Sequence, residues 1–126
     1  MERRYRPNIL IIGSGQAAQD ILDAILEGIQ QTLEGAAIET RELPGILNLP
    51  DNGDCGALIL RNVGNLTEAQ QLELAAWVEK TPAVPIVSTH RTSLYVLVTK
   101  GKFSERLYYR LNTVLEDASP GFRTTH

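Results

Sequence analysis

The feature that most constrains the fold is the change of hydrophobic period across Gly13-Ser14-Gly15. The four residues before this turn, Ile9–Ile12, form a continuous apolar and mostly β-branched run. Such a run is typical of a strand that is buried on both faces of a parallel sheet. After the turn, residues 16–34 carry apolar side chains at the 3.6-residue period of a helix. Strand, glycine turn and helix together predict the opening of a βαβ unit.

Further apolar runs, separated by proline, glycine and polar residues, predict four more strands. We expect them at residues 36–43, 56–60, 86–89 and 113–115. Thr67 and Gln70 have the spacing of a capping box, which predicts a helix that reaches about residue 80. Helical patterns also cover residues 93–99 and 100–112. This alternation predicts one domain over residues 1–126, an α/β three-layer αβα sandwich with a mostly parallel five-stranded sheet.

Two segments are expected to lie outside this framework. Residues 44–55 contain two prolines, two glycines and several Asp and Asn residues, which predicts a surface loop. The C-terminal segment from about residue 116 has the composition of a frayed tail.

Composition excludes several classes of function. A net charge of −3 and a pI near 5.3 give no general footprint for nucleic acid, so we expect no direct nucleic-acid binding. The single cysteine, Cys55, excludes an intrachain disulfide framework. The apolar run at Ile9–Ile12 is too short for a signal sequence or a membrane span. We therefore expect a cytoplasmic protein that does not associate with membranes.

Polar residues follow three of the predicted strands. Ligands in parallel sheets bind at the carboxyl ends of the strands. Chemistry is therefore expected at one edge of the sheet, at Gly13, Ser14, Gly15, Arg61, Asn62, His90 and Arg91. Two arginines at neighbouring strand ends would make this edge basic, and Asp20 is a candidate for the acid that pairs with them. No metal-ligand spacing is present in the sequence.

The segment 100–112 carries two different faces at helical spacing. Its apolar residues lie four apart and predict a side that faces the core: Phe103, Leu107 and Leu111. Its basic residues also lie four apart: Lys102, Arg106 and Arg110. Because like charges at this spacing destabilise a helix, we expect an acidic neighbour, a phosphate or a partner surface to compensate them.

Residues 101–112, Gly-Lys-Phe-Ser-Glu-Arg-Leu-Tyr-Tyr-Arg-Leu-Asn, resemble the arginine-finger segment in AAA+ domains of sigma-54-dependent transcription activators. Residues 55–66 are similar to the Walker B strand of that family and the turn after it, and residues 86–91 to its sensor strand. The resemblance covers about three quarters of the chain. It implies a P-loop, AAA+-like core, here without the helical lid and the sigma-54-contacting loop of the family.

The departures from the family pattern concern its catalytic residues. Gln19 stands where a P-loop has its lysine, and Arg61-Asn62 ends the strand that should supply acids for magnesium. His90-Arg91 replaces the polar sensor residue. Ser104 stands at the first arginine-finger position and Arg110 keeps the second. We therefore expect no ATPase activity, no catalytic residues, no bound metal and no ATP or other cofactor.

The resemblance implies a degenerate, non-catalytic domain that regulates bacterial transcription through protein–protein contacts. Arg106 and Arg110 are the candidate contact residues, and the partner would be an AAA+ activator or a second copy of the chain. The chain could be a standalone regulator or a segment of a longer response regulator.

Two alternatives stay open. Gly13-x-Gly15-x-x-Ala18 also fits a dinucleotide-binding fingerprint, and Glu39 and Glu42 lie about 20 residues on, where a ribose-binding acid is expected. The site at Gly13-Ser14-Gly15 would then bind a nucleotide or dinucleotide. Residual ATP-binding activator function is the other alternative, and it requires residues that replace the missing lysine and acids.

Overall fold

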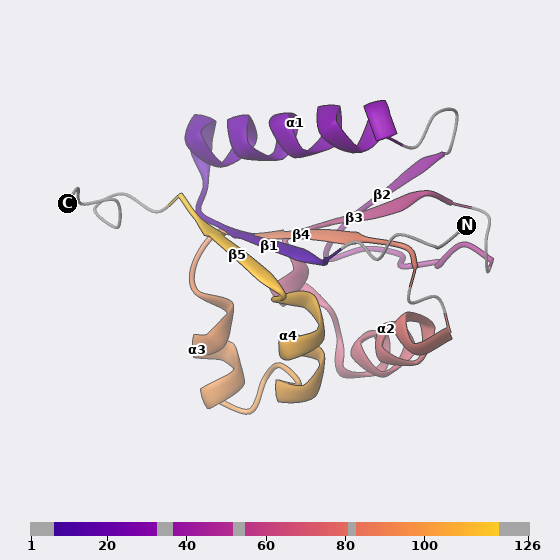
Figure 1. The fold of residues 1–126 in the computed structure, drawn as a ribbon. Helices are drawn as coiled ribbons and strands as arrows, with labels where there is room; N and C mark the ends of the chain where they lie inside the picture. Colours follow the sequence, from indigo (N-terminus) through magenta and orange to yellow (C-terminus); the bar gives the residue numbers. More distant parts are fainter. Residues whose placement is uncertain (1–6, 33–36, 52–54, 81–82, 119–126) are drawn as a thin grey trace.

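A computed structural model describes residues 7–32, 37–51, 55–80 and 83–118 of the chain. Within these residues a parallel sheet of five strands forms the centre of the molecule (Figure 1). The strands are β1 (Ile9–Ile12), β2 (Ile38–Glu42), β3 (Ala57–Arg61), β4 (Ile86–His90) and β5 (Val114–Asp117). Their spatial order is β2-β3-β4-β1-β5, and every pair is parallel. The predicted α/β class is confirmed.

Helices lie on both faces of this sheet. Helix α1 (Gly15–Thr32) covers one face, and a 3₁₀ turn η1 (Val63–Asn65) follows β3 toward the other face. That other face carries α2 (Glu68–Lys80), α3 (Leu94–Thr99) and α4 (Glu105–Leu111) (Figure 1). The predicted three-layer arrangement is therefore present. No helix in the described part of the chain is both long and apolar enough to cross a membrane.

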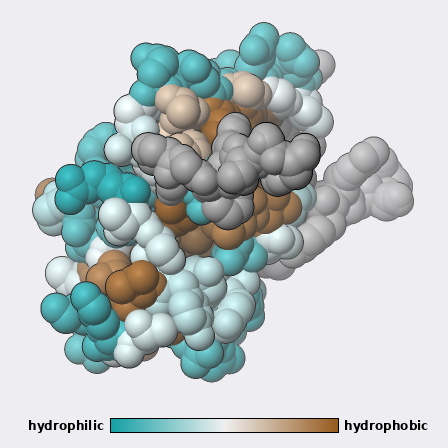
Figure 2. Space-filling view, turned by 90° about the vertical axis from the view of Figure 1, so that its left-hand side faces the viewer, coloured by the Kyte–Doolittle hydropathy of each residue, from teal (hydrophilic) through white to brown (hydrophobic). Residues whose placement is uncertain are grey.

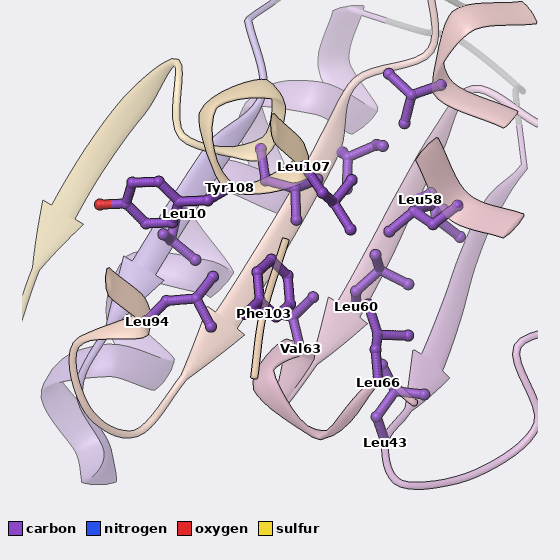
Figure 3. Close-up of a cluster of buried hydrophobic side chains, with 14 of the residues drawn as sticks. Leu10, Leu43, Leu58, Leu60, Val63, Leu66, Leu94, Phe103, Leu107 and Tyr108 are labelled. Carbon is purple, nitrogen blue, oxygen red and sulfur yellow. The ribbon is translucent and has the colours of Figure 1, made fainter. Parts of the chain in front are cut away.

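Strand β1 contributes to both hydrophobic cores because successive strand residues point to opposite faces. Leu10 packs in the cluster under α2, α3 and α4, together with Leu60, Leu107 and Tyr108 (Figure 3). Ile11 packs in the second cluster, with Leu22 of α1. Both β1 residues are completely buried. This double burial explains why the sequence of β1 is continuously apolar rather than alternating.

Asn8, the residue before β1, contacts the amino ends of β4 and β5 and the carboxyl end of α4. Its side-chain oxygen accepts the Ile86 N–H at 2.9 Å, and its amide group donates to the Arg110 carbonyl at 2.8 Å. Its own carbonyl accepts the Val114 N–H at 3.0 Å. The side chain of Asn8 therefore aligns β4 and the end of α4 with β1, and its backbone carbonyl aligns β5.

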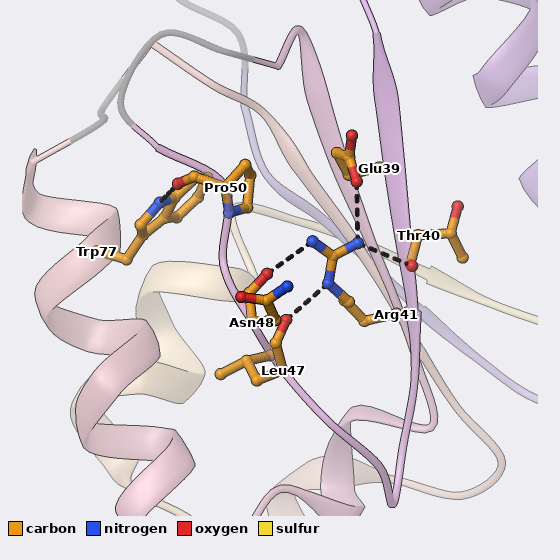
Figure 4. Close-up of polar contacts among 7 residues, drawn as sticks. All are labelled: Glu39, Thr40, Arg41, Leu47, Asn48, Pro50 and Trp77. Carbon is orange, nitrogen blue, oxygen red and sulfur yellow. Dashed lines mark hydrogen bonds and ion pairs between the residues drawn. The ribbon is translucent and has the colours of Figure 1, made fainter.

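The connection between β2 and β3 differs from the predicted surface loop. Leu47 in its middle is only 2% exposed and belongs to the core. Arg41 donates to the Leu47 carbonyl at 2.6 Å and to the Asn48 carbonyl at 2.7 Å (Figure 4). Trp77 of α2 donates to the Pro50 carbonyl at 2.8 Å. The loop packs against the sheet and α2, where a helix would ordinarily join two parallel strands, so the prediction is wrong for its buried part.

The predicted boundaries at the two C-terminal elements also change. Strand β5 continues through Glu116 and Asp117, which pair with Ile11 and Ile12 of β1. The Ala118 N–H still donates to the Ile12 carbonyl at 2.7 Å. Fraying from residue 116 is therefore wrong for these residues, because the ladder to β1 holds them. The rest of the expected tail, 119–126, lies outside the described residues.

The capping box at Thr67 is confirmed. The Thr67 hydroxyl accepts the Gln70 N–H at 3.1 Å, and the Gln70 side chain accepts the Thr67 N–H at 3.0 Å. Helix α2 accordingly begins at Glu68. The reciprocal pair satisfies two backbone donors that a helix start leaves free.

Replacing Arg41 with leucine should lower the free energy of unfolding by about 2–3 kcal/mol. Two loop carbonyls lose their charged donor, and a hydrogen bond to a charged group contributes about 1.5–3 kcal/mol. Urea denaturation measures the change. Arg91→Leu, at an exposed arginine, is the matched control and should stay within about 0.5 kcal/mol of wild type. An equal loss of unfolding free energy in both variants would contradict the role of Arg41 in fixing the loop between β2 and β3.

Candidate functional site

The carboxyl ends of β1, β3 and β4 surround a pocket of about 290 Å³ together with the first turn of α1. This edge of the sheet faces the viewer in Figure 2, where hydrophobic residues gather at the middle among hydrophilic ones. The residues predicted for this edge all line the pocket: Gly13, Ser14, Gly15, Gln19, Arg61, Asn62, His90 and Arg91. The structure thus brings together side chains that the sequence separates by up to 78 positions. Their roles remain predictions.

The turn between β1 and α1 requires glycine at two positions. Gly13 has φ = 132° and Gly15 has φ = 80°, values that residues with a side chain rarely adopt. The Gly13 N–H donates to the His90 carbonyl at 2.9 Å, which fixes the turn to the end of β4. Helix α1 starts at Gly15. Its first backbone N–H groups, which lack partners within the helix, therefore lie beside the pocket.

Arg61 at the end of β3 links three elements around the pocket. Its Nε lies 2.9 Å from Glu42 Oε2 at the end of β2, and its Nη2 donates to Gln19 Oε1 of α1 at 3.1 Å. We expected Asp20 as the acidic partner at this edge, and that prediction is wrong for Arg61. The reason is register: Glu42 lies directly opposite Arg61 in the β2–β3 ladder. The Asp20 carboxylate instead accepts a hydrogen bond from Gln16 at 2.7 Å.

His90 supports the turn after β3. Its Nδ1 accepts the Gly64 N–H at 3.2 Å, and a Cβ at position 64 would collide with the imidazole ring. Burial, and then the neighbouring Arg91 charge, lower the pKa of His90 below its ordinary value of 6.5. The imidazole is therefore neutral near pH 7 and can act as the acceptor that the Gly64 N–H needs. Asn62 lies just before this turn, in the left-handed conformation with φ = 60°. Its N–H donates to the Thr89 hydroxyl at 3.2 Å.

The polar groups of the pocket therefore largely bind one another. Arg61 is paired with a carboxylate and an amide, and the His90 ring is held by a backbone N–H. Within the described ranges no cluster of three or more His, Cys, Asp or Glu side chains could hold a metal ion. Glu39, the other candidate acid, lies 3.1 Å from Arg41 and contributes to the loop network in Figure 4 rather than to the pocket.

Helix α4 begins at Glu105, five residues later than the expected helix, because Ser104 caps it. The Ser104 hydroxyl accepts the Leu107 N–H at 3.1 Å. The predicted apolar face is buried as expected: Phe103, just before the helix, is 3% exposed, and Leu107 and Leu111 are fully buried (Figure 3). Lys102 lies in the preceding turn and does not extend a basic helix face.

The two α4 arginines meet an acidic residue of the same chain. Arg110 Nη2 lies 3.0 Å from Glu79 Oε2, and Arg106 Nη2 lies 3.7 Å from the same oxygen. Of the three expected sources of compensation, the structure therefore shows the acidic neighbour. Arg106 is 81% exposed, so its ion pair is strongly solvated.

Gln71 of α2 is a structural residue that the sequence did not reveal. It is 6% exposed, and its Oε1 accepts the Ser104 N–H at 2.7 Å. Its Nε2 donates to the carbonyls of Leu66 and Lys102, each at 3.2 Å. A polar residue at an inward helical position is the only signal in the sequence, and it does not say which backbone groups are bound. Gln71 fixes the segment that leads into α4.

No family model matches the chain, and no curated protein matches it at a significant level. Solved structures of NtrX from Brucella abortus do match. The complex with ADP is 18% identical over 90% of this chain and 32% of the NtrX chain, with a TM-score of 0.69. The complex with ATP is 17% identical over 90% and 33%, with a TM-score of 0.69. A third NtrX crystal structure is 18% identical over 91% and 32%, with a TM-score of 0.65.

Over the matched region the chain shares the α/β fold of these NtrX structures. It spans about a third of the length of the NtrX chains that it matches. At this level of identity the likeness concerns the fold alone. The shared fold agrees with the predicted α/β arrangement, in which Gly13-Ser14-Gly15 lies between β1 and α1.

We predict that the domain loses stability in mild acid through His90. Because its folded pKa lies below 6.5, the unfolded chain takes up the proton first. The stabilisation from neutral His90 is thus fully present above about pH 6.5 and is lost as the pH falls below that value. Thermal unfolding of wild type and His90→Gln is measured from pH 7.5 to 5. The unfolding temperature of the wild type should fall more steeply with decreasing pH than that of the variant. Parallel curves would contradict this prediction.

Replacing Gln71 with leucine should destabilise the domain by about 2–3 kcal/mol. The part-buried Ser104 N–H loses its acceptor and the Leu66 carbonyl loses its donor in a buried contact, and an unsatisfied buried group costs about 1–3 kcal/mol. Urea denaturation measures the loss, with Gln30→Leu on the exposed side of α1 as control. A loss below 0.5 kcal/mol, roughly that of a surface change, would show that water replaces the Gln71 contacts.

Proposed function

We propose that the chain is a non-catalytic, regulatory domain of the sigma-54 activator type, which acts by protein–protein interaction in bacterial transcription control. Its partner is an AAA+ activator or a second copy of the chain. In this proposal the domain hydrolyses no ATP and needs no cofactor.

The observation that carries the proposal is the Arg61 network at the pocket. Magnesium in a nucleotide site is held by oxygen ligands, and carboxylates supply its protein contacts. A guanidinium at the strand end repels the ion instead. Arg61 is also bound to Glu42 and to Gln19. Gln19, which stands where a P-loop has its lysine, therefore supports the fold rather than a phosphate. This arrangement favours a structural role for the former catalytic edge.

The exposed charge of α4 supports the interaction part of the proposal. Arg106 and Arg110 share one oxygen of Glu79, so the three side chains carry one positive charge in excess. A local basic patch on an acidic protein attracts a complementary acidic surface. Both guanidiniums keep exposed area through which a partner can reach them.

Nucleotide binding is the second candidate, and it has specific support. The left-handed glycines at Gly13 and Gly15 and the start of α1 provide backbone donors of the kind that bind phosphate. NtrX, which shares the fold, has been crystallised with ADP and with ATP. The absence of a lysine at position 19 and the Glu42 carboxylate in the pocket oppose this candidate.

Hydrolysis and binding of nucleotides test the non-catalytic part. We expect no magnesium-dependent phosphate release from ATP above the rate without protein, and no heat of binding with ATP, ADP or NAD in titration calorimetry. The triple variant Gln19→Lys, Arg61→Asp and Asn62→Glu restores the lysine and two acids and is the informative comparison. Binding or hydrolysis by the wild type would refute the proposal and favour the second candidate.

Binding to a purified AAA+ activator domain, such as that of NtrX, tests the interaction part. Arg110→Ala should weaken the affinity about tenfold, as expected for a lost charged contact at an interface. Lys100→Ala, at an exposed lysine outside α4, is the control and should bind like wild type. If wild type does not bind, or binds as well after Arg110→Ala, the α4 version of the proposal is wrong.

A further inference from the structure

A groove of about 640 Å³ lies between α2 and the segment that leads into α4. It is distinct from the pocket at the carboxyl ends of the strands. Its apolar lining comes from Leu72, Ala75 and Ala76 of α2 and from Phe103. Leu72 is 71% exposed, which is unusual for a large apolar side chain on a helix that already buries Leu74 and Val78 in the core. Alanines beside it leave a hollow rather than a ridge.

The two walls of this groove carry opposite charge. Glu68 and Glu79 line it on the α2 side, and Lys102 and Arg106 line it on the other side. The opposite charges also lie at matching positions along the length of the groove. Near one end Gln71, less than one turn after Glu68, donates to the Lys102 carbonyl. At the other end Glu79 reaches Arg106 and Arg110. An acidic row and a basic row therefore run side by side.

This charge pattern is complementary to itself. A two-fold axis parallel to the groove places the acidic wall of one copy opposite the basic wall of the other. Each residue keeps its position along the length of the groove under this rotation. Glu68 of one copy then faces Lys102 of the other, Glu79 faces Arg106, and each contact occurs twice. An acidic or a basic foreign partner would match one wall and be repelled by the opposite wall.

We propose that a second copy of the chain docks on this groove about such a two-fold axis, with each Leu72 inserted beside the alanines of the other copy. Burial removes from water the large apolar side chain that the monomer leaves exposed. The Glu79–Arg106 pair within one chain is 3.7 Å long and solvated, so its charges remain available to the second copy. This inference deepens and rests on the proposed interaction role, because it names one partner for that role.

Sedimentation equilibrium of the full chain tests the groove. We expect a reversible dimer that Leu72→Glu weakens about tenfold or more, since a charge would enter an apolar contact. Ile46→Glu is the matched control, because Ile46 is 82% exposed and lies outside the groove. A wild type that stays monomeric up to about 1 mM, or a dimer equally sensitive to both substitutions, would overturn the proposal.

A charge exchange tests the symmetry. Glu68→Lys alone and Lys102→Glu alone each place like charges opposite one another and should weaken the dimer several-fold. The double variant restores opposite charges at both contacts and should dimerise within about threefold of wild type. Glu73→Lys, on α2 but outside the groove, controls for the change in net charge. A double variant weaker than either single variant would exclude this two-fold arrangement.

The dimer test and the activator test can fail independently, because the activator test uses a different residue, Arg110. A monomeric chain that still binds an activator through Arg110 overturns the groove proposal alone. A dimer with the expected charge exchange but no activator binding overturns the activator partner alone. The lysine and glutamate substitutions lie on the surface, so circular dichroism should show the wild-type fold in every variant.

Discussion

The arrangement depends on the burial of Leu10 and Ile11 of β1 between β4 and β5. Its side chains divide between the two cores, with Leu10 on the side of α2, α3 and α4 and Ile11 on the side of α1. A shift of register by one residue would exchange these faces. Asn8 opposes such a shift, because its side chain is bonded to both β4 and the end of α4. The pocket and α4 thus keep fixed positions relative to one another.

The sequence was sufficient for the elements whose pattern is local. The apolar run of β1, the glycine turn after it and the Thr67 capping box each follow from neighbouring residues, and each is present in the structure. The edge at which the polar residues meet also followed, because parallel strands end on one side. Contacts between distant side chains did not. Glu42 pairs with Arg61 through the β2–β3 register, which the sequence alone does not specify.

The same distinction explains the buried loop and Gln71. Proline, glycine and asparagine in residues 44–55 correctly indicated that the described residues of this segment form no helix or strand. The burial of Leu47, however, depends on Arg41 and on α2. The role of Gln71 depends on backbone groups that lie 33 residues further along the chain. The sensor and Walker-like positions were identified through resemblance, and the structure added what now surrounds them: paired arginine, neutral imidazole and no metal cluster among the described residues.

The pocket's own side chains bind Arg61, through Glu42 and Gln19. A ligand shifts a conformational equilibrium only through unequal affinity for two states, and these contacts favour one arrangement of the pocket. If α4 and the α2 groove are the surfaces through which the domain acts, they are displayed at all times. Control would then pass from nucleotide turnover to abundance: the amount of protein made would set its effect on a partner.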